Sequence, residues 1–175
     1  VMAGVMTFFF DSLRTTFITQ QKLNINGDIR DVTNKLADEA REANYFTMYA
    51  SFYAQSASEP FGDFRSPTGG FTAADYRQRK GNSGDFLLLV YTGIDANPND
   101  TTPAPIEKLI GYFRDGGVDD TDQAPVRRFE VNVPSGDQND DLEALIPSSL
   151  VAESCPIVIN LVTGLADGHL FYNIE

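Results

Sequence analysis

Cysteine and histidine are almost absent from this chain of 175 residues, which has one of each, Cys155 and His169. A single cysteine cannot form a disulfide within the chain, so no disulfide framework stabilises the fold. To act as a nucleophile and its base, Cys155 and His169 would need a turn that brings them together and a third, orienting group, and no group of His and Cys has the spacing of a zinc site. The sequence therefore predicts a buried, inert thiol at Cys155 and no enzyme.

Basic side chains are also few, with 13 Lys and Arg against 25 Asp and Glu and a formal net charge of -12. Such a surface repels phosphate backbones and anionic lipid head groups, which excludes nucleic acid as an expected partner. The acidity is uneven, because residues 1–42 carry five basic and six acidic side chains and the remainder carries eight and nineteen. Copies of the first segment can pack together with little repulsion while the rest remains solvated.

No long hydrophobic run is present. The apolar run at the start, VMAGVMTFFF, has ten residues, and as a helix it rises about 15 Å, half of a bilayer core. As written, the chain is not expected to span a membrane.

Proline is absent from residues 1–43, and apolar residues recur there at steps of three and four. This spacing predicts one amphipathic helix about 60 Å long, with Asn26 and Gly27 as the point where the helix kinks or melts. No second long helix follows to cover the apolar stripe, so we expect it to pack against other copies of the chain. The residues expected at that subunit contact are Val1, Val5, Met6, Phe9, Leu13, Phe17, Ile25, Ile29, Val32 and Leu36.

After Asn44 the pattern changes to short β-type runs separated by turn residues. Strands are predicted over residues 86–94, 106–115 and 126–133, with the last two forming an antiparallel hairpin, and a second hairpin is predicted from 157–165 and 169–174. Residues 45–54 fit either a helix or a strand, and short helices are expected within 73–79 and 140–150. The predicted fold class is α+β, with an assembly helix over 1–43 leading to an antiparallel β-rich head over 44–175.

The first 45 residues resemble the helix of type IV pilins and type II secretion pseudopilins, in particular the J-type and PilW-like groups. In that family a small-apolar segment runs into polar turns and then an L-x-x-E/D-x-R-x-A-like stretch, here Leu36, Glu39, Arg41 and Ala43. The family's mature chain begins with an aromatic residue and a Thr-Leu-x-Glu-like motif, whereas this sequence begins at Val1 and has no acidic residue before Asp11. The expectation is that the first half of the apolar segment lies upstream of the sequence given.

The resemblance implies a structural subunit of an extracellular, helical pilus-like filament, a fimbrium with roles such as adhesion. Its expected partners are identical subunits and the pilus assembly machinery, with the inner membrane as its location only before assembly. No cofactor is expected. Two alternatives stay open, a minor pseudopilin of a type II secretion-like system and a secreted surface- or carbohydrate-binding module.

Acidic loops suggest two weaker sites. Calcium is a candidate ligand for Asp95, Asn97, Asn99, Asp119, Asp120 and Asp122, although the first group lacks the glycine and glutamate of a calcium loop. Residues 99–101 form an N-glycosylation sequon at Asn99, and Thr101 and Thr102 precede Pro103 as acceptors for O-linked sugar. Solvated acidic loops are the simpler interpretation of both groups.

Overall fold

The computed structural model describes residues 27–53, 64–65, 67, 70–79, 81–94, 104–115, 125–138, 140–159 and 170–172. The chain divides into two compact units, Val1–Ala37 and Asp38–Glu175. We describe each unit by itself. The described helix covers residues 27–42 and crosses this division.

The helix has one half-buried stripe, which repeats at steps of three and four. Ile29, Val32 and Leu36 are half-buried in the first unit, and Glu39 and Ala43 continue the same spacing in the second. All other residues from Gly27 to Glu42 are exposed. The apolar residues that recur at steps of three and four in the sequence therefore lie on one face of the helix, and the carboxylate of Glu39 lies at the C-terminal end of that face.

The prediction of a pilin-like fold with one long N-terminal helix over residues 1–43 is wrong. The described helix has 16 residues, or about 24 Å at 1.5 Å per residue. Apolar periodicity shows which face a helix would bury, but it does not fix how long the helix is. The predicted contact residues from Val1 to Ile25, together with Asn26, lie outside the described residues.

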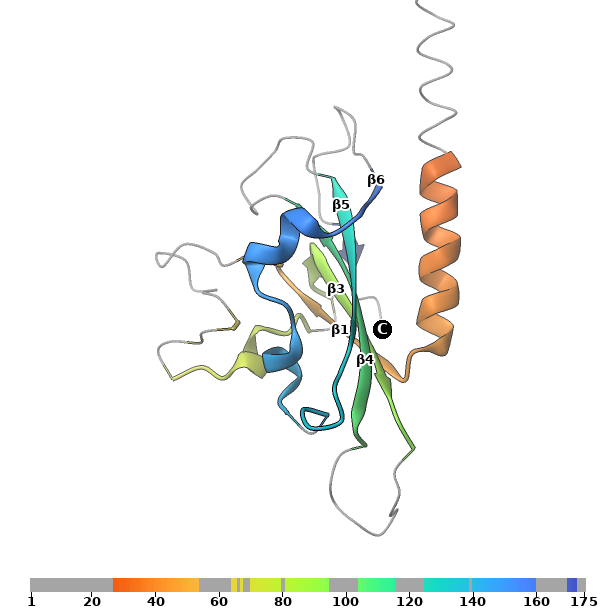
Figure 1. Cartoon of the computed structure of the whole chain (residues 1–175). Coiled ribbons are helices and arrows are strands. Elements are labelled where there is room, and N and C mark those ends of the chain that lie inside the picture. The colour runs from red at the N-terminus through yellow and green to blue at the C-terminus, as the bar shows by residue number, and fades with distance from the viewer. Residues whose placement is uncertain are drawn as a thin grey trace, which may run out of the picture. The chain divides into compact units, whose positions relative to one another are not determined.

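A five-stranded antiparallel sheet forms the centre of the second unit, in the order β1-β3-β4-β5-β6, and a small sheet pairs β2 with β7 (Figure 1). The strands are β1 Tyr45–Tyr49, β2 Ser83–Gly84, β3 Phe86–Thr92, β4 Ile106–Arg114, β5 Val126–Asn132, β6 Ile157–Ile159 and β7 Phe171–Tyr172. The 3-10 helices are η1 Ala73–Tyr76, η2 Leu142–Leu145 and η3 Ser149–Ser154. The predicted central strand and the β4–β5 hairpin are confirmed, and the ambiguous run from Tyr45 is a strand at its start.

The predicted C-terminal hairpin is wrong for the described strands. β6 pairs with β5, and β7 pairs with β2, so the two segments join different sheets. A tight-turn signal between two apolar runs indicates that a hairpin is locally feasible, but it does not decide which edge each run joins.

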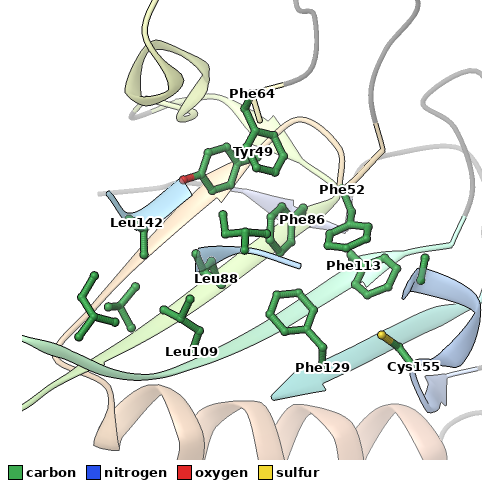
Figure 2. Close-up of a cluster of buried hydrophobic side chains, with 14 of the residues drawn as sticks. Tyr49, Phe52, Phe64, Phe86, Leu88, Leu109, Phe113, Phe129, Leu142 and Cys155 are labelled. Carbon is green, nitrogen blue, oxygen red and sulfur yellow. The ribbon is translucent and has the colours of Figure 1, made fainter. Parts of the chain in front are cut away.

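Aromatic rings fill the core on one face of the main sheet (Figure 2). Phe52 stacks on Phe113 with ring centroids 4.0 Å apart, and Tyr49 stacks on Phe64 at 4.6 Å. Phe86 packs edge-on to Phe52 at 5.3 Å. These rings supply a large apolar area and a defined packing geometry, and η2 and η3 close the core with Leu142, Ile146, Ala152 and Cys155.

The opposite face of the same strands is polar at its β5 side. Tyr112 of β4 lies in register with Arg128 of β5, and Lys108 lies in register with Asn132. Because side chains alternate along a strand, the adjacent Arg127 and Arg128 point to opposite faces. One arginine therefore belongs to the core side and the other to the helix-end cluster described below.

Candidate functional site

The carboxylate of Glu39 binds two side chains of the sheet. Arg128 Nη2 donates to Glu39 Oε1 at 2.8 Å and Arg128 Nε approaches Oε2 at 3.4 Å, while the Tyr112 hydroxyl donates to Oε2 at 2.6 Å. The side chains of Arg128 and Glu39 are 12% and 15% exposed. A shielded, charge-assisted pair of this kind is stronger than an ion pair in open water.

Backbone contacts strengthen the same attachment. The Tyr91 hydroxyl donates to the Glu39 carbonyl at 2.7 Å, and Ala43 N donates to that same carbonyl at 3.1 Å. Asn44 then joins the sheet, because its N–H donates to Val90 O at 2.9 Å and its Oδ1 accepts from Thr92 N at 2.8 Å. The last helical turn is thus tied to β3, β4 and β5. We call Glu39, Asn44, Tyr91, Tyr112 and Arg128 the helix-end cluster.

The electrostatics of the helix-end cluster favour a neutral tyrosine beside an ion pair. Burial, then the hydrogen bond and the charge of Glu39, raise the pKa of Tyr112 well above its usual value. Burial works to lower the pKa of Arg128, but hydrogen bonds to Glu39 and Glu130 outweigh it and raise the pKa. Arg128 Nη2 also donates to Glu130 Oε2 at 2.7 Å. The guanidinium therefore stays charged and binds two carboxylates.

Two further clusters repeat this arrangement of a carboxylate with a tyrosine and an arginine. Glu143 of η2 accepts from the Tyr49 hydroxyl at 2.8 Å and from Arg77 Nε at 2.7 Å. Asp115, after β4, accepts from the Tyr53 hydroxyl and from Arg127 Nε, and Arg127 Nη1 also donates to Cys155 O at 2.7 Å.

Each of these three carboxylates binds two side chains at once, which holds one element against another. The helix-end cluster fixes the last helical turn, Glu143 fixes η2 to β1, and Asp115 fixes the end of β4 to β5 and to Tyr53, which follows β1. Arginine suits such positions because its planar fork donates in several directions from one group. The chemistry that the arrangement supports is attachment, since each carboxylate is already hydrogen bonded within the protein.

The other predicted site residues fall in different places. Gly27 is the first described residue of the helix and has no atom near the position of an added Cβ. Cys155 is buried, as predicted, its thiol donates to Val151 O at 3.4 Å, and burial raises its pKa. Outside the described residues lie His169, the calcium candidates Asp95, Asn97, Asn99, Asp119, Asp120 and Asp122, and the glycan acceptors Asn99, Thr101 and Thr102.

Within the described ranges, no three His, Cys, Asp or Glu side chains gather as a metal site would require. Over the same ranges, no helix combines the length and the apolar character needed to cross a bilayer. No protein-family model matches the chain, and neither does any curated protein or solved structure.

Sequence reasoning named Glu39 within the family-like stretch but missed its partners Arg128, Tyr112 and Tyr91. A signal was present in β5, where two consecutive arginines in an alternating strand place one charge on each face. A buried arginine on a sheet face requires a carboxylate. The sequence could not show which carboxylate, because Glu39 and Arg128 are 89 positions apart.

Proposed function

We propose that the chain is a non-enzymatic structural subunit of an extracellular filament of the type IV pilus kind, polymerising through its N-terminal segment. The observation that carries this proposal is the helix-end cluster. A filament subunit must pass force from the segment that polymerises to the head that faces solvent. A helix whose last turn is held by a shielded ion pair and by three strands is suited to that task.

The stripe of the helix supplies the second support. Ile29, Val32 and Leu36 follow one line along the helix, and the intervening residues are polar or small and exposed. A narrow apolar stripe of this kind is the usual seam of helix-to-helix packing. Repetition of one such contact without closure would give a helical fibre.

Charge distribution agrees with the same proposal. Residues 1–42 are nearly neutral, with five basic and six acidic side chains, and the remainder holds nearly all of the net charge of -12. A near-neutral segment packs closely with its copies, while acidic heads stay apart and hydrated on the outside of a fibre.

The test is electron microscopy of material sheared from cells that express the whole gene, with mass spectrometry of the sheared fraction. We expect thin fibres made mostly of this chain. If fibres contain only traces of it, the chain is a minor pseudopilin, and if it is secreted without fibres and binds a surface or a carbohydrate, it is a binding module. Either result overturns the proposal.

A matched pair of variants tests the role of the stripe. Ile29→Asp places a charge on the stripe, whereas Asn34→Asp adds the same charge at an exposed position of the same helix. We expect the first variant to lose fibres and the second to keep them, with both heads folded by circular dichroism. Normal fibres from Ile29→Asp would contradict packing through this face.

A further inference from the structure

One nitrogen of Arg128 serves two carboxylates that come from different elements. Arg128 Nη2 donates to Glu39 Oε1 of the last helical turn at 2.8 Å, and to Glu130 Oε2 of its own strand, β5, at 2.7 Å. Glu130 lies two positions after Arg128 on the same face of β5, so this second pair remains in place if the helix end moves. Arg128 thus has one partner that the helix brings and one that its own strand supplies.

The two carboxylates differ in their access to water. The side chains of Arg128 and Glu39 are 12% and 15% exposed, whereas the side chain of Glu130 is 42% exposed. The pair with Glu39 is therefore shielded, and the pair with Glu130 is partly solvated. A partly solvated pair contributes less stability than a shielded one, but it still neutralises the arginine.

The last helical turn carries little apolar surface. Four of the six residues from 38 to 43 are exposed, and the half-buried ones are Glu39 and Ala43. The turn is held mainly by hydrogen bonds to Glu39, which Arg128, Tyr112 and Tyr91 donate. Opening this turn therefore exposes little apolar area, and its main cost is the loss of polar partners.

Glu130 lowers that cost. When a shielded charge loses its partner it is left uncompensated, and this penalty exceeds that of an unpaired neutral group. Arg128 avoids the penalty, because it keeps Glu130 when Glu39 leaves. Tyr112 loses its acceptor in the same step, but its hydroxyl is neutral. The helix end can therefore open without separating Arg128 from every carboxylate that it binds.

The two compact units of the chain divide between Ala37 and Asp38, directly before this turn. We propose that the helix end is a reversible joint, in which Glu39 and Glu130 share Arg128 while the joint is closed and Glu130 alone holds Arg128 while it is open. The inference goes beyond the filament proposal and does not require it, because it concerns a movement within one chain. The joint is closed in the structure, where Arg128 binds both carboxylates.

Amide hydrogen exchange of the free full chain tests the joint, under conditions where exchange reports the opening equilibrium. The reporting amides are those of Ala43, which donates to Glu39 O, and Asn44, which donates to Val90 O. Glu130→Gln removes the open-state partner, so opening must separate Arg128 from both carboxylates. We expect exchange at the two amides to slow roughly two- to fivefold, the effect of one half-exposed ion pair.

The sign of this effect is the decisive result. Glu39 and Glu130 bind the same nitrogen, yet Glu39→Gln should accelerate exchange at the reporting amides and Glu130→Gln should slow it. A glutamate that only positions Arg128 for Glu39 would give acceleration in both variants. Acceleration or an unchanged rate in Glu130→Gln would therefore overturn the proposal.

Two controls separate the sharing of Arg128 from other effects of charge. Glu107→Gln removes an exposed carboxylate elsewhere on the sheet, on β4, and should leave both rates unchanged. In an Arg128→Gln background, Glu130→Gln should lose its effect, because no guanidinium remains to be shared. Equal slowing in that background would overturn the proposal, since repulsion between Glu39 and Glu130 would then be the cause. These measurements use the free chain, so their failure leaves the filament proposal standing.

Discussion

At the scale of single residues, one arrangement of side chains recurs: a carboxylate that accepts hydrogen bonds from a tyrosine hydroxyl and from an arginine. The three carboxylates are Glu39, Asp115 and Glu143, and their partners come from distant parts of the chain. The tyrosine donates without adding charge, and the arginine neutralises the carboxylate. In each cluster the tyrosine and the arginine shield one carboxylate from solvent at a contact between two elements, in a chain that is strongly acidic.

The Glu143 cluster gives the fold an acid-sensitive component. Burial works to raise the pKa of this carboxyl, but the hydrogen bonds from Arg77 and Tyr49 and the charge of Arg77 together lower it below the ordinary value of 4.5. A group whose pKa is lower in the folded state stabilises the fold above its unfolded pKa, and this stabilisation is lost as the pH falls through the folded pKa. We therefore expect Glu143→Gln to lower the free energy of unfolding at neutral pH, with the gap to wild type narrowing below pH 4.5.

Urea unfolding across a pH series measures this difference. Asp137→Asn is the matched control, because it removes a carboxylate that is exposed in a turn, and its effect should stay within about 0.5 kcal/mol at every pH. A gap for Glu143→Gln that stays constant down to pH 3 would show that Glu143 does not contribute through its charge.

At the scale of elements, Gly111 of β4 leaves room for the side chain of Phe129, its partner in β5. A Cβ built on Gly111 would lie 2.2 Å from Cε1 and Cζ of Phe129, whose ring is buried among Phe52, Phe86 and Phe113. Gly111→Ala must displace that ring and should cost about 1–3 kcal/mol.

The Gly111 prediction is checked by chemical denaturation with a rescue. Phe129→Leu should cost less in the Gly111→Ala background than in the wild type, because the smaller side chain leaves room for the added methyl. Gly136→Ala is the control, since its added Cβ meets nothing within 4 Å. Equal costs of Phe129→Leu in both backgrounds would show that the two positions do not compete for space.

The helix end gives a second prediction for an element. Glu39→Gln removes the charge that Arg128 binds, whereas Glu42→Gln changes an exposed residue of the same turn. Hydrogen bonds to charged groups contribute about 1.5–3 kcal/mol, so amide exchange at Ala43 and Asn44 should accelerate roughly ten- to a hundredfold in the first variant. The amides of β4 and β5 should change little. Uniform acceleration across the sheet would mean that Glu39 supports the whole head and not the helix end in particular.

The sequence predicts elements better than their partners. A continuous apolar run located β3, and alternation of apolar and polar residues located β4 and β5, each to within two residues at each end, because a strand leaves such patterns locally. It could not assign β6 to β5 or β7 to β2, since pairing depends on contacts between distant segments. For the same reason the sequence predicted only part of the candidate site. Glu39 belongs to a short family-like stretch that can be recognised in the sequence, whereas Arg128 meets Glu39 only when the chain folds.

At the scale of the whole molecule, charge should govern assembly. The heads carry most of the net charge of -12, so copies that meet through the helix stripe repel one another. Salt shortens the range of this repulsion from about 10 Å at 0.1 M to about 3 Å at 1 M ionic strength.

We therefore expect assembly of the full chain, followed by light scattering and sedimentation, to become faster and more complete as sodium chloride rises. Asp137→Asn, Asp140→Asn and Asp141→Asn together remove three exposed negative charges at positions outside the helix stripe. This triple variant should assemble at lower salt than the wild type, because less repulsion needs screening. Assembly that weakens with salt in both proteins would mean that attraction between charged groups, and not apolar contact, holds the copies together.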